Sequence, residues 1–272
     1  MQDIVLYGHE KNVLPGRYWP CEDPKAALLV IHGLGEHCGR YDGMAQALNK
    51  QGIEVYGYDQ RGHGANPLGP KGYARVEDLE KDILSVLDAL REKSDLPLFL
   101  LGHSMGGGLV TYTMVHAQPD VRAAIICSPW IELVSALPEL PAKILKKHPK
   151  IAGKAGIRNG IPETGLCHDD AVVKAYADDP LVHDHIAFAL AADMLNAADY
   201  SLAHGDRAKV KLLMTHGSED GICSPEGSRK FAAGCPMADL HIFEGAYHEV
   251  HNEPDAKDAL FSLIGSFILE NI

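Results

Sequence analysis

A short glycine-rich segment between an apolar run and a helical pattern is the feature that most restricts how this chain folds. Residues 102–106 have the pattern G-x-S-x-G, with Ser104 at its centre, directly after the apolar residues 98–101. Two more glycines then open a helical segment. In this context the pattern predicts a sharp strand-to-helix turn that lifts the serine hydroxyl above the edge of a parallel sheet. Glycines flank the serine because larger side chains would clash with the neighbouring strand and helix.

The rest of the chain alternates between strand-like and helix-like segments, as such a sheet requires. Residues 76–90 place apolar side chains at helical spacing, residues 256–268 predict a closing helix, and residues 4–7 could add an antiparallel edge strand. The strand-like runs are apolar at nearly every residue, as expected when both faces of a sheet are buried. We therefore predict an α/β fold with a mostly parallel central sheet and helices on both faces. The predicted core strands are 27–32, 53–59, 98–102, 123–127, 210–216 and 240–244.

One interval between predicted strands is too long for a simple crossover. Residues 128–209 separate the fourth and fifth core strands, whereas a crossover needs only about 10–12 residues or slightly more. The interval begins at Ser128 and Pro129 and contains a proline-rich stretch. We expect residues 1–128 and 198–272 to form the core, and residues 129–197 to form an inserted lid over the sheet.

The partners that would activate a serine are also present, in a fixed order. A serine hydroxyl is a poor nucleophile at neutral pH unless a base removes its proton. In folds with this turn, an acidic residue and then a histidine follow the serine, each on a loop after a strand. Asp220 lies four residues past the fifth predicted core strand, and His248 lies four residues past the sixth. We predict Ser104 as nucleophile, His248 as general base and Asp220 as the residue that orients the base.

Neighbouring residues offer alternatives to this assignment. His251 lies about one helical turn after His248 and is the alternative base, and Glu219 is the alternative acid. In a purely structural interpretation Ser104 occupies an ordinary tight turn, and the other two residues lie on surface loops. That interpretation requires three independent placements at strand ends to coincide.

Acyl transfer also needs hydrogen-bond donors for the oxyanion that forms on the carbonyl oxygen. Residues 32–35, His-Gly-Leu-Gly, follow the first core strand, where this fold supplies one backbone amide. We predict that the N–H groups of Leu34 and Met105 fill this role. The same glycines could suggest a dinucleotide-binding loop, but their spacing differs from the usual pattern and no acidic ribose ligand follows.

Composition and charge narrow the expected partners. A net charge of -12 argues against nucleic acid, because phosphate binding needs a basic face. No apolar run is long enough to span a bilayer, and the N-terminus lacks the features of a secretory signal, so we expect a cytoplasmic protein. The six scattered cysteines predict free thiols. We expect no metal and no organic cofactor, since the metal-like run 183–185, His-Asp-His, places its side chains at positions that do not converge.

One segment departs from the acidic balance of the chain. Residues 139–158 contain six basic residues and one acidic residue, a net charge of +5, and apolar residues interrupt the lysines. We hypothesise that this short amphipathic segment of the lid docks reversibly on anionic lipid surfaces and makes the protein peripheral to the membrane. The alternative is a solvated lid face that relieves the charge imbalance. The basic residues are Lys143, Lys146, Lys147, Lys150, Lys154 and Arg158.

Several motifs of the chain together resemble those of a known family. Residues 32–37 and 39–41, the turn at 102–107 and the run 244–248, Glu-Gly-Ala-Tyr-His, resemble monoacylglycerol lipases and lysophospholipase-like proteins among the α/β-hydrolases. The resemblance is collinear from about residue 25 to 255. It implies an acyl tunnel beneath the lid, and hydrolysis of a monoacylglycerol to fatty acid and glycerol. Residues 65–69 depart from the family pattern, which affects the expected shape of the pocket entrance but not the catalytic residues.

The resemblance further implies which residues hold the glycerol head group. By position in the motifs these are Glu36 and Arg40 in the oxyanion loop, Tyr176 in the lid, and His251. Each also has a structural alternative: an ion pair that shapes the loop, a packed lid aromatic, and a helix-cap or surface histidine. Cys223 lies where some family members carry a thiol near the site, although nothing in ester hydrolysis requires it.

The leading hypothesis for function is hydrolysis of monoacylglycerols through an acyl-enzyme on Ser104. The alternative enzyme activities are those of a lysophospholipase or of a general carboxylesterase for short acyl chains. A non-catalytic ligand-binding protein on the same fold would be expected to lack part of the catalytic set, whereas all three residues are present.

Overall fold

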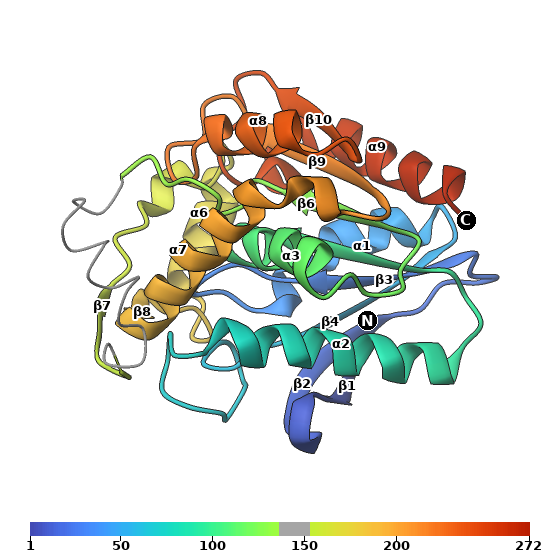
Figure 1. Cartoon of the computed structure of the whole chain (residues 1–272), viewed down its shortest axis with the longest axis horizontal. Helices are drawn as coiled ribbons and strands as arrows, with labels where there is room; N and C mark the ends of the chain where they lie inside the picture. Colours follow the sequence, from blue (N-terminus) through green and yellow to red (C-terminus); the bar gives the residue numbers. More distant parts are fainter. Residues whose placement is uncertain (136–152) are drawn as a thin grey trace.

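A twisted eight-stranded sheet passes through the centre of the computed structural model, which describes residues 1–135 and 153–272 (Figure 1). Its strand order is β1-β2-β4-β3-β5-β6-β9-β10. The strands from β4 to β10 pair in parallel, and β1 and β2 add an antiparallel edge. The bounds are β1 Gln2–Tyr7, β2 Val13–Trp19, β3 Ala26–Ile31, β4 Ile53–Tyr58, β5 Leu98–His103, β6 Ala123–Cys127, β9 Lys211–Gly217 and β10 Ala238–Phe243.

The predicted α/β fold is confirmed, and each of the six predicted core strands is present with its ends shifted by at most one or two residues. The edge strand expected near residue 4 is part of β1. Strand β2 has no clear signal in the sequence, because Pro15 and Gly16 interrupt its apolar pattern. Pro15 lies just before the part of β2 that pairs with β4, and a Cβ on Gly16 would lie 2.6 Å from the Gly57 carbonyl oxygen of β4.

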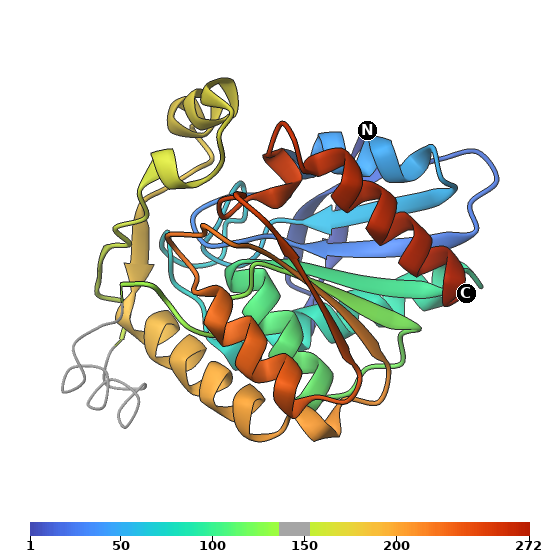
Figure 2. The same cartoon turned by 90° about the horizontal axis from the view of Figure 1, so that it is seen from above.

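Helices cover both faces of the sheet (Figure 2). On one face α1 packs against α9, and on the other α3 packs against α7, with α2 and α8 beside them. Successive residues of β3 alternate between the two apolar cores: Leu29 and Ile31 belong to one, Leu28 and Val30 to the other. This alternation explains why the strand is apolar at every position. The bounds are α1 Asp42–Asn49, α2 Val76–Lys93, α3 Met105–His116, α7 Phe188–Ala203, α8 Pro225–Gly234 and α9 Lys257–Glu270.

The long interval between β6 and β9 adds elements at one side of the sheet (Figure 2). Among the described residues it contains a small antiparallel pair, β7 and β8, and the helix α6, before α7 returns to the core. The predicted lid boundary at residue 197 lies inside α7, and the division into core and lid stays a prediction. The bounds are β7 Gly156–Arg158, β8 His185–Ala187 and α6 Asp170–Asp178, and short 3-10 helices occupy His9–Lys11, Cys38–Tyr41, Glu163–Gly165, Gly205–Arg207 and Val250–Asn252.

The basic segment predicted to touch lipid falls largely outside the described residues, including Lys143, Lys146, Lys147 and Lys150. Of its two described cations, Arg158 pairs with Asp184 at 2.9 Å, and the Lys154 ammonium lies 5.5 Å from the centre of the Tyr73 ring. In residues 1–135 and 153–272, no helix has both the length and the hydropathy needed to cross a bilayer. All six cysteines are free thiols.

The turn between β5 and α3 has a strained backbone that positions Ser104. Its φ is 55° and its ψ is -119°, a conformation that residues with a side chain rarely adopt. A Cβ on Gly102 would lie 2.3 Å from the carbonyl oxygen of Gly106, and a Cβ on Gly106 would lie 2.2 Å from that of Ile31. The helix therefore begins directly against β3 and β5, and only glycine fits at these two positions.

Substitution of Gly106 tests this close approach. We expect Gly106→Ala to lower the free energy of unfolding by about 1–3 kcal/mol, because the added methyl group must displace the backbone of a central strand. Chemical denaturation measures the change. Gly43→Ala in α1 is the matched control, since no atom lies within 4 Å of its added methyl group. Equal stability of the two variants would show that the contact at Gly106 is not tight.

Candidate active site

Three loops at the carboxyl edge of the parallel sheet bring the predicted catalytic residues together. Ser104 directly follows β5, Asp220 follows β9, and His248 follows β10. Open α/β sheets assemble their sites at this edge. Ser104 and His248 line the same small pocket, and both are almost fully buried.

The Asp220 carboxylate is held by four hydrogen bonds. Its Oδ2 accepts from His248 Nδ1 at 2.7 Å and from His216 Nε2 at 3.0 Å. Its Oδ1 accepts from the backbone N–H groups of Ile222 and Cys223, at 2.8 and 2.9 Å. Burial alone raises the pKa of Asp220, but the neighbouring His248 and the hydrogen bonds outweigh burial and hold the pKa well below its usual value. Asp220 is therefore ionised at neutral pH.

This carboxylate fixes the proton arrangement of His248. Because Nδ1 must donate to Asp220, the other ring nitrogen, Nε2, is free to accept a proton when the ring is neutral. Burial lowers the pKa of His248, whereas the charge and hydrogen bond of Asp220 raise it, and the net result is a pKa above the ordinary value of 6.5. His248 thus has the properties of a general base that works at neutral and mildly alkaline pH.

His216, near the end of β9, is a contact of the site that the sequence analysis missed. Besides Asp220, its Nε2 lies 3.0 Å from the Cys223 carbonyl oxygen, and its Nδ1 lies 2.7 Å from Ser228 Oγ. In the sequence it is one polar residue at the end of an apolar run, which gives no signal. Its spacing of four residues from Asp220 was the available clue.

The environment of Ser104 includes a thiol. Ser104 and Cys223 line the same pocket. Burial, together with the nearby charge of Asp220, raises the pKa of the Cys223 thiol well above its ordinary value. Since the thiolate is the reactive form, a thiol held protonated is a weak competitor for the reaction at Ser104.

The predicted oxyanion donors lie on either side of the serine. Met105 begins α3, so its N–H is one of the unpaired amides at a helix N-terminus. Leu34 lines the pocket beside Ser104. Over the residues that the structure describes, neither N–H has an acceptor within the chain. Their role in holding an oxyanion stays a prediction, and both amides are available for it.

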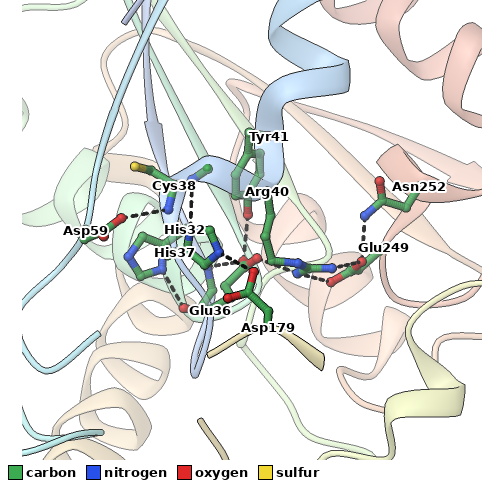
Figure 3. A network of polar contacts seen from close by, with 12 residues as sticks. His32, Glu36, His37, Cys38, Arg40, Tyr41, Asp59, Asp179, Glu249 and Asn252 are labelled. Carbon is green, nitrogen blue, oxygen red and sulfur yellow. Dashed lines mark hydrogen bonds and ion pairs between the residues drawn. The ribbon is translucent and has the colours of Figure 1, made fainter. Parts of the chain in front are cut away.

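Two of the predicted glycerol contacts form a buried cluster of charges (Figure 3). The Arg40 guanidinium donates to Glu36 Oε2 at 2.6 Å and to both carboxylate oxygens of Glu249, at 2.7 and 2.8 Å. The Tyr41 hydroxyl donates to Glu36 Oε1 at 2.8 Å, and the Gly33 N–H donates to the same oxygen at 2.6 Å. We call Glu36, Arg40, Tyr41 and Glu249 the Arg40 cluster.

Both carboxylates of the Arg40 cluster are ionised. Burial by itself raises the pKa of Glu249, but Arg40 outweighs burial and lowers the pKa to about 2. The same opposition leaves the pKa of Glu36 well below its ordinary value. Glu36 and Arg40 therefore form the ion pair of the structural alternative, and they also line the pocket beside Ser104.

The remaining predicted contacts, Tyr176 and His251, differ in position. The Tyr176 ring lies 4.7 Å from the Arg40 guanidinium carbon and lines the pocket, and no described residue hydrogen-bonds its hydroxyl. His251 stacks on the Tyr41 ring and packs edge-on against His103, and it is not among the residues that line the pocket. Tyr176 therefore lines the same pocket as Ser104, whereas His251 contacts His103 and does not line that pocket.

A metal has one conceivable site in the described part of the chain. Ligand atoms of His103, Glu249 and His251 lie within 4.8 Å of one another. However, both carboxylate oxygens of Glu249 already bind Arg40, whose positive charge opposes a cation there. In the run 183–185, His183 bonds the Gly62 carbonyl whereas His185 pairs with Asp184 at the surface, so the two histidines have different partners. We assign no metal to either group.

Ser104 lies where two pockets meet. The smaller, of about 10 Å³, has room for about one water-sized group, and its lining includes Glu36, Arg40, Tyr176, His248 and Glu249. The larger, of about 170 Å³, is mainly apolar. This arrangement offers an apolar chain and a hydroxyl-sized polar group separate places on the two sides of Ser104. Apolar residues of the larger pocket include Leu34, Trp130, Leu133, Ile157, Ile161, Ile186, Phe188 and Ile222.

Removal of the central cation tests the Arg40 cluster. We expect Arg40→Met to lower the free energy of unfolding by about 3–5 kcal/mol, because two buried carboxylates lose their counter-charge. In the wild type, the contribution of Glu249 is present above about pH 4.5 and is lost as the pH falls toward 2. The exposed Arg122 gives the control variant Arg122→Met, for which we expect a change within about 0.5 kcal/mol. Similar denaturation midpoints for both variants would contradict the account.

Comparisons with known proteins bear on the same site. The model of the family described as serine aminopeptidase, S33, matches residues 22–255. The monoglyceride lipase of Rattus norvegicus is 31% identical over 94% of this chain and 86% of its own length. An abhydrolase domain-containing protein of Dictyostelium discoideum is 33% identical over 98% of this chain, which spans only 29% of that longer protein. The crystal structure of Paleococcus ferrophilus monoacylglycerol lipase has a TM-score of 0.86 at 28% identity, covering 95% of this chain and 99% of that one.

Proposed function

Because the chain belongs to the serine aminopeptidase S33 family of α/β-hydrolases, we propose that it cleaves monoacylglycerols to fatty acid and glycerol through an acyl-enzyme on Ser104. The observation that carries the proposal is the position of Ser104 between an apolar pocket and a small pocket with charged residues in its wall, beside the hydrogen-bonded pair of His248 and Asp220. Relatives named monoglyceride lipase or monoacylglycerol lipase support the choice of ester.

In the first step Ser104 attacks the ester carbonyl carbon while His248 Nε2 takes the hydroxyl proton. The carbonyl oxygen becomes an oxyanion, which the N–H groups of Leu34 and Met105 stabilise. The tetrahedral intermediate then collapses, the bond from the carbonyl carbon to the glycerol oxygen breaks, and His248 gives its proton to that oxygen. Glycerol leaves, and the acyl group remains on Ser104. Asp220 stabilises the imidazolium form of His248 and stays ionised throughout.

In the second step water takes the place of glycerol. His248 accepts a proton from the water as its oxygen attacks the acyl carbon, and the same two amides hold the second oxyanion. Collapse breaks the bond to Ser104 Oγ, which recovers its proton from His248. The fatty acid is released and the enzyme is regenerated, so neither step consumes a cofactor.

The two pockets suggest how a monoacylglycerol is oriented. The acyl chain occupies the apolar pocket under the segment 129–197, which we propose is the lid. One glycerol hydroxyl enters the smaller pocket, where the Tyr176 hydroxyl is available to hydrogen-bond it. Glu36 and Arg40 act mainly by shaping the wall of that pocket, since their own charges are paired.

Initial rates on three esters of equal acyl length test the substrate: a 1-monoacylglycerol, a lysophosphatidylcholine and a methyl ester. We expect the highest kcat/KM for the glyceride, and we expect Tyr176→Phe to reduce that preference by about 2- to 10-fold, the value of one hydrogen bond. Ser104→Ala should lower kcat by about 10⁶-fold. Faster turnover of lysophosphatidylcholine would indicate a lysophospholipase, and equal or faster turnover of the methyl ester would indicate a general carboxylesterase.

Reversible docking of the basic segment 139–158 on anionic lipid is a further part of the proposal. Its apolar residues among lysines, in a chain of net charge -12, are the supporting observation. Sedimentation with vesicles of anionic phospholipid measures it. We expect the variant with Lys143, Lys146, Lys147 and Lys150 changed to Glu to remain in the supernatant. Sedimentation equal to that of the wild type would exclude docking through this segment.

A further inference from the structure

His216, a buried histidine next to Asp220, has no part in the mechanism described above. The His216 side chain is fully buried, and so is that of Asp220. Its Nε2 is shared between Asp220 Oδ2 and the Cys223 carbonyl oxygen, each at 3.0 Å. Its Nδ1 lies 2.7 Å from the hydroxyl oxygen of Ser228, which is also fully buried.

These partners determine which nitrogen of His216 carries the proton. A carboxylate and a carbonyl can only accept, so Nε2 must be the N–H donor. The Ser228 hydroxyl can then donate to Nδ1 of the neutral ring. Ser228 is thus suited to select the tautomer that presents an N–H to Asp220.

The contacts of His216 span both ends of the loop that carries the catalytic acid. One bond reaches the Asp220 side chain and another reaches the Cys223 backbone, which itself donates to Asp220 Oδ1. Ser228 lies on α8, one turn after the Ser224 cap. The chain Ser228, His216, Asp220, His248 therefore links a rigid helix to the general base.

We propose that His216, with its tautomer set by Ser228, is a positioning residue that orients the Asp220 carboxylate toward His248. This inference rests on the proposed function, in which Asp220 orients the base. Because His216 and His248 donate to the same oxygen, and two backbone amides hold the other, the carboxylate cannot rotate away from His248. Asp220 Oδ2 also accepts a hydrogen bond from His216. Because its negative charge is shared between two donors, it stabilises the proton on His248 less strongly than it would with His248 alone.

This sharing of the Asp220 charge predicts how the pH profile changes when His216 is replaced. Without the His216 N–H, the charge of Asp220 acts more fully on His248, and the pKa of His248 rises. Since the neutral form of His248 is the reactive one, the acidic limb of kcat/KM moves to higher pH. The other groups facing His248 are unchanged by the substitution, and they are Glu36, Glu249, His103 and His251.

Four variants separate this role from simple packing. His216→Leu removes the N–H, His216→Gln keeps an N–H donor on a side chain of similar reach, and Ser228→Ala removes the group that sets the tautomer. Ser262→Ala is the control, since this exposed serine on α9 bonds only its own helix, at the Asp258 carbonyl. We measure kcat and KM on a p-nitrophenyl ester from pH 5 to 9, with thermal unfolding to verify that each variant is folded.

For His216→Leu we expect kcat to fall by roughly 10- to 100-fold, the usual cost of losing a residue that hydrogen-bonds a site group from behind. We expect KM to be unchanged and the acidic limb of kcat/KM to lie at higher pH. His216→Gln should recover most of kcat and the wild-type limb, Ser228→Ala should show a smaller loss of kcat, and Ser262→Ala should match the wild type. If His216→Leu does not fold, Ser228→Ala and His216→Gln still decide.

The inference is overturned if the folded His216→Leu variant keeps the wild-type kcat and limb. It is also overturned if His216→Gln is as impaired as His216→Leu, or, where the Leu variant does not fold, if Ser228→Ala matches Ser262→Ala. Failure of the proposed function is a separate outcome, because the wild type would then hydrolyse the ester no faster than Ser104→Ala does.

Discussion

The strained turn at Ser104 is the constraint on which the rest of the site depends. A residue with a side chain in this conformation costs about 1–3 kcal/mol, and it persists only where its surroundings enforce it. Here close packing holds the turn in place. Helix α3 begins against β3 and β5 at Gly102 and Gly106, where no side chain fits. The turn places the serine hydroxyl and the first free amides of α3 at the same point. The proposed nucleophile and one proposed oxyanion donor thus come from one local geometry.

The other catalytic parts come from distant segments, and buried polar contacts hold them in register. The Arg40 cluster joins the oxyanion loop to Glu249, the residue directly after His248. The backbone N–H of His183 donates to the Gly35 carbonyl at 2.8 Å, so the segment before β8 also holds the oxyanion loop. A buried ion pair adds little net stability, yet loss of one partner is costly, which makes such a cluster a strict constraint on relative position. The geometry of the proposed base and oxyanion donors therefore depends on charges that take no part in the proposed reaction.

Local patterns made most of the fold predictable. Strands buried on both faces are apolar throughout, and the serine turn has a signature of its own, so the core strands and the order of Ser104, Asp220 and His248 follow from the sequence. Strand β2 lacks such a pattern because Pro15 and Gly16 interrupt it. The pairing of Arg40 with Glu249 had no sequence signal either, since Glu249 is remote in the chain and nothing near either residue marks the pair. His216 was missed because its spacing of four residues from Asp220 was the one clue, and the fold alone brings Ser228 to its other nitrogen.

The central claim is that Ser104 is the nucleophile activated by this constellation. The most direct measurement is to treat the protein with a fluorophosphonate probe and locate the adduct by peptide mass spectrometry, with Ser104→Ala as control. The account predicts one probe per chain on the peptide that contains Ser104, and no adduct in the variant. Absence of labelling in the folded wild type, or an adduct on another residue such as Cys223, would contradict it.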